Sequence, residues 1–280
     1  MPQSPNRKLK IEILTIFPAM FEGPFRESLI GKARARGLLE IAVHDLRDFS
    51  LDKHRKADDA LFGGGPGMLL KLEPIHRAFK SLGALKTGRS KPTVVYLSPQ
   101  GKPLSQNLAR DLALRKHLIL LCGHYEGIDE RAMRWIDLEV SIGDFVLTGG
   151  EIPAMALADA VSRMVPGVVK EWGSVQNDSF FNGTLDCAQY TRPAVFLGMK
   201  VPEVLISGNH KAIAAWRRKD ALERTQKKRS DLLAYHACTK NSISGPEAVY
   251  QNGPAQVPSG RHGAGPREGR GRRIGKDPVL

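Results

Sequence analysis

The chain has 280 residues, which is enough for one or two domains with a substantial buried core. Its 42 lysines and arginines against 29 acidic residues give a formal net charge of +13, which favours a polyanionic partner, nucleic acid before an anionic membrane. No apolar run approaches the roughly 18 residues of a spanning helix, and no signal-peptide core follows the start, so we expect a cytoplasmic protein with no membrane span.

The first elements alternate between strand and helix patterns. Residues 10–17 alternate and then run apolar, which predicts a strand, and residues 39–44 predict a second one. Between them, residues 20–35 carry apolar side chains at helical spacing and end before Gly37, which predicts a helix. A strand–helix–strand order predicts a parallel sheet covered by helices.

A polar, glycine-rich stretch follows at residues 52–68, with Asp58-Asp59 and the run Gly63-Gly64-Gly65-Pro66-Gly67 at its centre. A helix is expected at residues 73–82, and glycines before a helix can cradle a phosphate. However, no Gly-Lys-Ser/Thr ending and no G-x-G-x-x-G pattern is present, which excludes the common nucleotide fingerprints. A flexible surface loop therefore stays an equal alternative.

The centre of the chain repeats one pattern three times, an apolar run of strand length and then a loop of glycine and small polar residues. The three runs and their loops are residues 93–97 with 98–101, 118–122 with 123–127, and 141–147 with 148–151. Because ligands bind outside the carboxyl ends of parallel strands, we expect these loops to form one pocket built mostly from backbone.

Helices are expected at residues 110–116 and 152–164, the second with Pro153 in its first turn. An arginine at the end of such a helix, here Arg163, is usually a cap on the helix dipole. Residues 168–178 show no periodicity, and we place the domain linker there.

The chain after the linker predicts a small, mainly helical domain. Short extended pieces at Val195 and residues 199–204 precede a cap at residues 206–209 and a helix that turns Ile213, Trp216 and Leu222 toward a core. Its basic residues could simply be solvated, but they outnumber the acidic ones, which favours phosphate contact. A unit this small needs a docking partner, for which a second copy of the chain is one candidate.

The composition changes again near the carboxyl end. Residues 242–280 are rich in glycine, proline and arginine without an apolar period, so we expect a disordered tail. The three cysteines, Cys122, Cys187 and Cys238, form no CxxC pair and indicate neither a disulfide framework nor a zinc site.

The expected central pocket lacks a phosphate fingerprint, a nucleophile elbow and a His/Cys metal cluster. A nucleoside-like ligand without phosphates would suit it better, because loop N–H and C=O groups can bind an adenine ring between apolar walls. S-adenosylmethionine is such a ligand.

Several long motifs carry a resemblance to a known family. They are residues 96–101 (YLSPQG), 122–129 (CGHYEGID), 141–151 (SIGDFVLTGGE), Asp58-Asp59 with 63–68 (GGGPGM), 178–180 (DSF), 190–193 (YTRP) and 216–218 (WRR). In order and spacing they closely resemble the TrmD family of bacterial tRNA (guanine-N1)-methyltransferases, which are SPOUT methyltransferases. The resemblance covers residues 10–233.

The resemblance implies an α/β SPOUT-type parallel sheet with a deep trefoil knot, plus a small helical carboxy-terminal domain. It implies a donor-binding domain at residues 1–167, a linker at 168–177, a tRNA-binding domain at 178–234, and a basic tail at 235–280 outside the family core. It further implies a homodimer whose subunits share each active site. The implied reaction moves a methyl group from S-adenosylmethionine to N1 of guanosine 37 of tRNA, preceded by guanosine.

The same resemblance implies roles for individual residues. Asp178 would be the base for the N1 proton, although from the residues alone a turn or cap is the simpler interpretation. Arg163 would orient the guanine, and Glu126 would lie near the methionine end of the donor, where Mg²⁺ is thought to act, while no metal ligands are assigned. The implied donor-binding residues are Tyr96, Leu97, Ser98, Pro99, Gly101, Gly123, Tyr125, Glu126, Gly127, Ser141, Ile142, Gly143, Asp144, Phe145, Val146, Leu147, Gly149, Gly150 and Pro153. The implied RNA-binding residues are Gly64, Gly65, Arg192, Arg217, Arg218, Lys227 and Arg229.

Some positions depart from the family pattern. Phe145 stands where the family frequently has tyrosine. Ala60-Leu61-Phe62 stands where it frequently has a polar residue, proline and tyrosine, and Ala188-Gln189 stands in place of the usual Pro-His. Lost hydroxyls could alter contacts with the donor or the base, while ring stacking would survive. Two alternatives stay open: a SPOUT enzyme for another RNA, and a noncatalytic RNA-binding protein.

Overall fold

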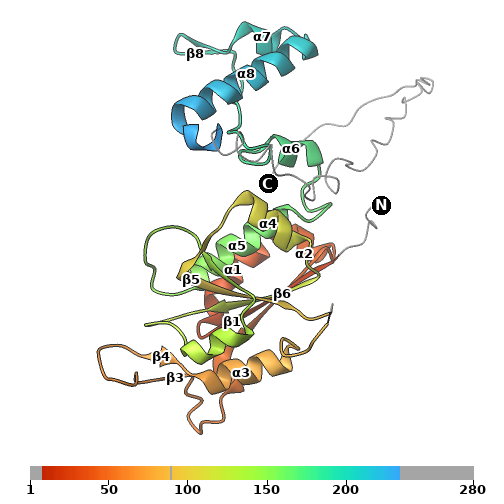
Figure 1. The fold of residues 1–280 in the computed structure, drawn as a ribbon. Coiled ribbons are helices and arrows are strands. Elements are labelled where there is room, and N and C mark those ends of the chain that lie inside the picture. The colour runs from red at the N-terminus through yellow and green to blue at the C-terminus, as the bar shows by residue number, and fades with distance from the viewer. Residues whose placement is uncertain (1–7, 89, 234–280) are drawn as a thin grey trace, which may run out of the picture. The chain divides into compact units, whose positions relative to one another are not determined.

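A five-stranded parallel sheet forms the centre of the protein (Figure 1). The computed structural model describes residues 8–88 and 90–233, which lie in the first of the chain's two units, residues 1–244. The strands are β1 (Leu9–Thr15), β2 (Leu39–Asp45), β5 (Thr93–Pro103), β6 (His117–Cys122) and β7 (Leu138–Ser141), in the order β2-β1-β6-β5-β7. All four neighbouring pairs are parallel, which confirms the expected α/β fold class.

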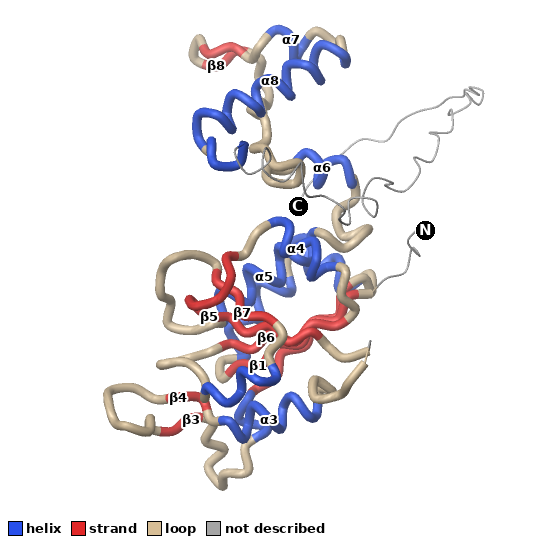
Figure 2. The backbone as a smooth tube through the Cα atoms, in the orientation of Figure 1, coloured by secondary structure: helices blue, strands red, loops and turns tan. Residues whose placement is uncertain are grey.

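Helices cover both faces of the sheet, as Figure 2 shows, and this is why its strands read as continuous apolar runs. One core contains side chains of α1 (Glu22–Arg26), α2 (Ser28–Ala35), α4 (Gln106–Ala113) and α5 (Glu151–Arg163). The other contains side chains of α3 (Leu72–Ser81) and the short 3-10 helices η2 (Leu46–Phe49) and η3 (Glu130–Trp135). Alternate residues of β6 enter opposite cores. Leu118 and Leu120 pack in the core with α5, and Ile119 and Leu121 pack in the core with α3.

The single helix expected at residues 20–35 is wrong. The structure has a 3-10 helix, η1 (Pro18–Phe21), and then α1 and α2, with a break before Ser28, whose φ is 54°. The two helices approach so closely that a Cβ on Gly31 would lie 2.1 Å from the carbonyl oxygen of Arg26. The apolar periodicity continues across this break, so periodicity alone could not reveal it.

The glycine-rich stretch contains a minimal antiparallel pair, β3 (Asp58–Asp59) and β4 (Leu69–Leu70). Asp58 and Asp59 are therefore in a strand, within a stretch whose composition favours a loop. Gly64 and Gly65 lie in the connecting loop with φ values of 76° and 115°, a backbone region that favours glycine.

Two of the three central strand limits also differ from the prediction. β5 extends through residues 98–103 and pairs with β7 on both sides of a register shift between Leu97 and Lys102. β7 ends at Ser141, so the apolar residues 142–147 form a loop in which Phe145 and Val146 are exposed. The apolar residues 142–147 predict a buried strand, whereas in the structure they form a loop beside a cavity.

The stretch at residues 168–178, expected to lack regular structure, contains α6 (Trp172–Asn177). Its Val175 is completely buried in the first core, and Trp172 packs against the same cluster. One turn of helix with two apolar anchors is too short to produce a visible period.

The carboxy-terminal elements are β8 (Val195–Phe196), β9 (Met199–Lys200), α7 (Glu203–Ile206) and α8 (His210–Lys228). The Asn209 side chain caps α8 by accepting a hydrogen bond from the N–H of Ala212 at 3.1 Å. Leu222, expected in a core, is 51% exposed, and Thr225 is the buried residue of this helix instead. The tail at residues 235–280, including Cys238, lies outside the described residues.

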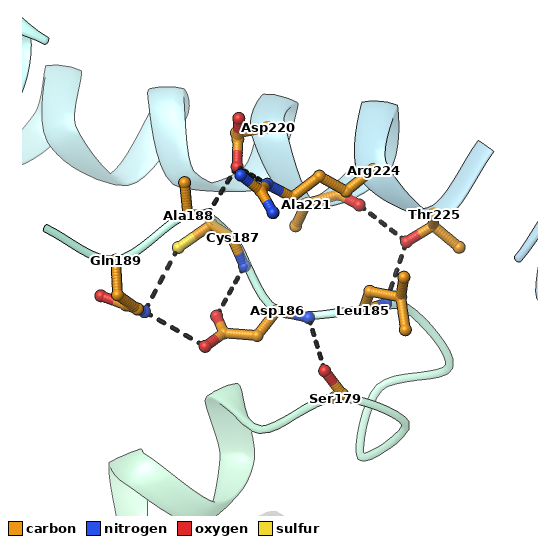
Figure 3. A network of polar contacts seen from close by, with 10 residues as sticks. All are labelled: Ser179, Leu185, Asp186, Cys187, Ala188, Gln189, Asp220, Ala221, Arg224 and Thr225. Carbon is orange, nitrogen blue, oxygen red and sulfur yellow. Dashed lines mark hydrogen bonds and ion pairs between the residues drawn. The ribbon is translucent and has the colours of Figure 1, made fainter. Parts of the chain in front are cut away.

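Polar contacts join the segment at residues 185–189 to α8 (Figure 3). The N–H of Leu185 donates to the Thr225 hydroxyl at 2.9 Å, and the N–H of Ala188 donates to the Asp220 carboxylate at 2.7 Å. Arg224 binds the same Asp220 oxygen. These bonds satisfy backbone groups that are not part of a sheet or helix.

Candidate functional site

A cavity of about 250 Å³ lies beside residues 96–100 of β5 and the ends of β6 and β7, and it is far larger than the roughly 10–15 Å³ needed to hold one water. It is lined by Tyr96, Leu97, Ser98, Pro99, Gln100, Gly123, His124, Tyr125, Glu126, Gly127, Val140, Ser141, Ile142, Gly143, Phe145, Val146, Leu147, Thr148, Gly149, Gly150 and Pro153. These residues come from the three strand ends and their loops, so the loops converge as the repeated sequence pattern predicts.

Glycines keep the cavity wall free of side chains. A Cβ on Gly123 would lie 2.9 Å from the Tyr96 hydroxyl oxygen, and one on Gly150 would lie 2.8 Å from the Cα of Cys122. Both distances are shorter than Cβ contacts in real proteins, so a larger residue would push the loops apart. The glycines therefore leave backbone N–H and C=O groups exposed to a ligand.

Two of the expected donor-binding residues do not line the cavity. A Cβ on Gly101 would lie 2.4 Å from the amide nitrogen of Val140, so this glycine allows β5 and β7 to approach each other. Asp144 is exposed to solvent beside the cavity loop. The structure thus gives Gly101 a packing role that spacing alone did not suggest.

Tyr96 lies within β5, before its register shift, and Cys122 is the last residue of β6. Burial, with a smaller contribution from Glu139 and Glu130, raises the pKa of Tyr96 to about 12, so its hydroxyl stays a neutral hydrogen-bonding group. Complete burial also raises the pKa of the Cys122 thiol well above its usual value. Cys122 is therefore an unreactive buried side chain, as its position at a strand end predicts.

The glycine-rich loop ends against the second cavity loop. The N–H of Glu126 donates to the carbonyl of Met68 at 3.1 Å, and the N–H of Leu70 donates to the carbonyl of Gly127. A Cβ on Gly67 would lie 2.6 Å from the Glu126 carboxylate. The structure therefore places Glu126 between the cavity and the glycine-rich loop, which contains Gly64 and Gly65.

Arg163 and Asp178 form an ion pair, with a guanidinium nitrogen of Arg163 donating to the Asp178 carboxylate. Both side chains are partly exposed, at 37% and 42%, so other groups can reach them. Neither residue lines the cavity. Arg163 ends α5, whereas the cavity lies at the start of this helix, and 12 steps of about 1.5 Å separate the two ends by about 18 Å.

The expected RNA-binding residues lie mostly in the carboxy-terminal elements. Arg217, Arg218 and Lys227 are exposed on α8, and Arg192 is exposed before β8. Arg229 follows α8, pairs with the Asp231 carboxylate at 2.7 Å and lies 5.6 Å from the Phe180 ring. Gly64 and Gly65 lie instead in the loop between β3 and β4.

Sequence reasoning missed four residues of the cavity wall, namely Gln100, His124, Val140 and Thr148. All four lie within the recognised motifs or directly before one, and the signal was available in their position between expected ligand residues. His124 differs from the other three because its ring lies beside the buried carboxylate of Glu151.

Two further properties concern metals and membranes. Among residues 8–88 and 90–233, no group of three or more His, Cys, Asp or Glu side chains is arranged to hold a metal ion. In the same part of the chain, no helix combines the length and the apolar character that crossing a membrane requires.

The fold and the cavity define an α/β protein with a backbone-lined site beside the register shift of β5 and the carboxyl ends of the neighbouring parallel strands β6 and β7. Residues 9–235 match the sequence profile of the family described as tRNA (Guanine-1)-methyltransferase TrmD. The chain belongs to this family.

Similar proteins named tRNA (guanine-N(1)-)-methyltransferase occur in several bacteria. One from Endomicrobium trichonymphae is 55% identical over 231 residues, which cover 80% of this chain and 99% of that protein. One from Desulforudis audaxviator is 55% identical over 223 residues, 80% of this chain and 89% of that protein. One from Synechococcus elongatus is 54% identical over 225 residues, which cover 80% of this chain and 94% of that protein.

Proposed function

We propose that this protein transfers a methyl group from S-adenosylmethionine to N1 of guanosine 37 of tRNA, where the preceding nucleotide is guanosine. Family membership over residues 9–235 is the observation that carries this proposal. The relatives named above are called tRNA (guanine-N(1)-)-methyltransferases, and the net charge of +13 suits an RNA substrate. We place the activity in the cytoplasm.

The cavity is the proposed donor site, and its chemistry fits a nucleoside. A wall of glycine backbone beside Leu97, Ile142 and Leu147 offers hydrogen-bonding groups between apolar surfaces. Bound S-adenosylmethionine would supply an electrophilic methyl group. Phe145 lines the cavity where the family often has tyrosine, so here a ring contact without a hydroxyl is expected.

Asp178 and Arg163 would act on the guanine. N1 of guanine carries a proton at neutral pH, so a base must accept it as the nitrogen forms its bond to the methyl carbon. The Asp178 carboxylate would accept that proton. Arg163 already donates to Asp178, and its guanidinium would stabilise the negative charge that develops at O6.

We propose that two subunits share each site. Within one chain, the length of α5 separates the cavity from Arg163 and Asp178 by about 18 Å, far beyond the roughly 3 Å needed between reacting groups. A second chain, arranged by a two-fold axis, could bring its own Asp178 to the cavity of the first. The mainly helical region at residues 178–234 would then bind tRNA, joined by a linker at residues 168–177 to the donor-binding region at 1–167.

We further propose that the cavity loops form a deep trefoil knot, as in SPOUT methyltransferases. The loops after β6 and β7 are adjacent, since the N–H of Gly150 donates to the carbonyl of Gly123 at 2.7 Å, as a knot built from these loops requires. Knots are rare exceptions to the usual connection rules, and the family resemblance is the main argument for one here.

A Mg²⁺ requirement is also part of the proposal. The exposed carboxylate of Glu126 at the cavity is the residue that would hold the ion. Mg²⁺ keeps several waters and often binds through one or two carboxylates together with its substrate, so a single carboxylate is compatible with it.

The proposed RNA surface combines the basic residues of α8 with the glycine-rich loop. Arg217, Arg218 and Lys227 offer charges to phosphates, and Gly64 and Gly65 allow close approach of a backbone. Arg192 and Arg229 would add further phosphate contacts.

The decisive experiment is nucleoside analysis of tRNA after incubation with the purified full-length protein, S-adenosylmethionine and Mg²⁺. A transcript with guanosine at positions 36 and 37 should gain N1-methylguanosine at position 37, and a transcript with adenosine at position 36 should gain little. Methylation of other RNAs alone would favour a different SPOUT substrate. Binding of RNA without any methyl transfer would favour a noncatalytic RNA-binding protein.

A further inference from the structure

Two buried polar side chains, Thr15 and Glu151, connect through His124 to the cavity wall. Thr15 is the last residue of β1, Glu151 is the first residue of α5, and His124 lies in the loop after β6. The Thr15 hydroxyl donates to Oε1 of Glu151 at 2.8 Å, and the other carboxylate oxygen, Oε2, lies 3.6 Å from Nδ1 of His124. Thr15 and Glu151 are 0% and 2% exposed and so are shielded from solvent, whereas the His124 side chain is 17% exposed and lines the cavity.

A carboxylate buried this deeply requires polar partners, because an unpaired buried charge is strongly unfavourable. The start of α5 favours a negative charge at Glu151, and Thr15 satisfies one of its two oxygens. Nδ1 of His124 is buried and has no hydrogen-bond partner among the described residues. Glu151 Oε2 and His124 Nδ1 are therefore each other's remaining partner, at a distance slightly beyond the ordinary hydrogen-bond range.

His124 lies at the junction of two cavity loops. Its backbone forms isolated bridges with Gly127 in its own loop and with Gly149 in the loop after β7. A Cβ on Gly149 would lie 2.4 Å from His124 Nδ1 and 2.2 Å from Glu151 Oε2, so the two side chains fill the space beside this glycine. The imidazole ring also packs 4.8 Å from the ring of Phe17, which follows β1.

We propose that His124 is a positioning residue, which acts through Glu151 to hold the loops at residues 123–127 and 148–150 in the arrangement that receives the methyl donor. Thr15 fixes the carboxylate to a central strand, and His124 transmits that position to both loops. This inference rests on the proposed function, because it assigns the cavity to S-adenosylmethionine.

Two substitutions at His124 distinguish the packing of its ring from the polar contact of its Nδ1. His124→Phe keeps the packing against Phe17 and removes Nδ1, whereas His124→Asn loses the ring and keeps a donor near the position of Nδ1. Calorimetric titration of the full-length protein with S-adenosylmethionine should show binding weakened about tenfold or more in His124→Phe and within about threefold of wild type in His124→Asn.

A kinetic readout distinguishes positioning from chemistry. In tRNA methylation, His124→Phe should raise KM for S-adenosylmethionine about tenfold and leave kcat at saturating donor within about twofold, because the reacting groups are untouched. His76→Phe is the matched control: His76 packs 4.9 Å from Trp135, away from the cavity wall, and its loss should leave donor binding unchanged.

A double-mutant cycle tests the coupling itself. In a Glu151→Gln background, His124→Phe should weaken donor binding by less than about threefold, because the charged partner is already gone. Full additivity of the two losses, or wild-type affinity in His124→Phe, would overturn the inference. If His124→Phe fails to fold, Thr15→Val replaces it, and unchanged donor affinity there would overturn the inference equally.

Titration of the wild-type protein distinguishes failure of the donor assignment from failure of the positioning role of His124. Binding of S-adenosylmethionine to wild type with equal binding to every His124 variant would leave the proposed function standing and refute the positioning role. No binding to the wild-type protein would refute the donor assignment and the inference with it.

Discussion

The Arg163–Asp178 ion pair gives the clearest single-residue prediction. Asp178→Asn keeps a hydrogen-bond acceptor for Arg163 but removes the proton acceptor, so the methyl-transfer rate should fall about 10²- to 10⁴-fold. Affinity for S-adenosylmethionine should stay unchanged, since Asp178 does not line the cavity. Single-turnover methylation and calorimetric titration measure the two quantities separately.

Asp159 provides the matched control for this substitution. It is exposed on α5, the helix that also carries Arg163, and Asp159→Asn should keep both rate and affinity. A rate for Asp178→Asn within a few fold of wild type would mean that another group accepts the N1 proton.

A second residue-scale prediction concerns Glu12, a carboxylate in the middle of β1 that is 4% exposed. Burial alone would raise its pKa, but hydrogen bonds from Lys10 at 2.8 Å and from His117 at 2.6 Å outweigh it, and the pKa is lowered. Glu12→Gln should reduce the free energy of unfolding at pH 7 by about 1–3 kcal/mol.

The sign of the pKa shift fixes the pH dependence of this effect. Because the folded pKa of Glu12 lies below the unfolded value of about 4.3, its contribution to stability is present above that value and is lost as pH falls through the folded pKa. Denaturant titrations of wild type and Glu12→Gln should therefore converge as pH falls below the lowered pKa of Glu12. Glu40→Gln, which removes an exposed partner of Lys8, should change stability little, and a gap for Glu12→Gln that persists in acid would contradict the assignment.

At the scale of elements, the sequence predicted β1, β2 and β6 and the helices α3, α5 and α8, because their periods extend over several turns or alternations, whereas the helix expected at residues 110–116 is α4 (Gln106–Ala113). It failed where tertiary contacts overrode a local pattern: the break before Ser28, the end of β7 at Ser141 and the short helix α6. The end of β7 and α6 depend on a cavity and on core contacts with residues distant in sequence, and the break before Ser28 depends on a single positive φ, none of which a local period records.

Gly101 provides a test of one close approach. Gly101→Ala would place a Cβ 2.4 Å from the amide nitrogen of Val140, so β7 must shift away from β5. We expect a loss of about 1–3 kcal/mol in unfolding free energy and weaker binding of S-adenosylmethionine, measured by denaturant titration and calorimetry.

Gly173 in α6 serves as the control for Gly101. A Cβ there has no heavy atom within 4 Å, and alanine is the better helix former, so Gly173→Ala should stabilise by up to about 1 kcal/mol. Equal effects of the two substitutions would show that the Gly101 contact is relieved without cost.

The contact between α8 and residues 185–189 allows another element-scale prediction. Thr225→Val removes the hydroxyl that accepts the N–H of Leu185 at 2.9 Å and donates to the carbonyl of Ala221 at 2.7 Å. The unpaired N–H should reduce unfolding free energy by about 1–3 kcal/mol and speed hydrogen exchange at Leu185. Thr225→Ser keeps the hydroxyl and should retain slow exchange, and equally fast exchange in both variants would contradict the role of this bond.

At the scale of the whole molecule, the candidate site could be predicted only in parts. The repeated pattern of the three glycine loops predicted a shared pocket, and the structure brings these loops together around one cavity. The proposed role of Asp178 rests on family resemblance alone, since an aspartate after Asn177 by itself suggests a turn or cap. Its ion pair with Arg163, at the end of α5 distant from the cavity, is a property that only the structure supplies.

That distance leads to a prediction about mixed chains. If the cavity of one subunit works with Asp178 of another, then chains with Asp178→Asn and chains with Gly149→Val should complement each other. Gly149→Val would crowd His124 and Glu151 and should abolish donor binding, because even a Cβ at this position would lie 2.2 Å from the Glu151 carboxylate. After random reassociation, about half of the dimers are mixed, and one of their two sites combines an intact cavity with an intact Asp178.

Methyl transfer in the mixture should therefore recover to about a quarter of the wild-type rate, while each variant alone stays nearly inactive. Unfolding and refolding the chains together, followed by single-turnover assays, measures this recovery. Joining Asp178→Asn and Gly149→Val in one chain and mixing it with wild type controls for subunit exchange, because in those dimers each site retains one defect. Absence of recovery after verified exchange would mean that one chain folds back to complete its own site, against the separation that α5 imposes.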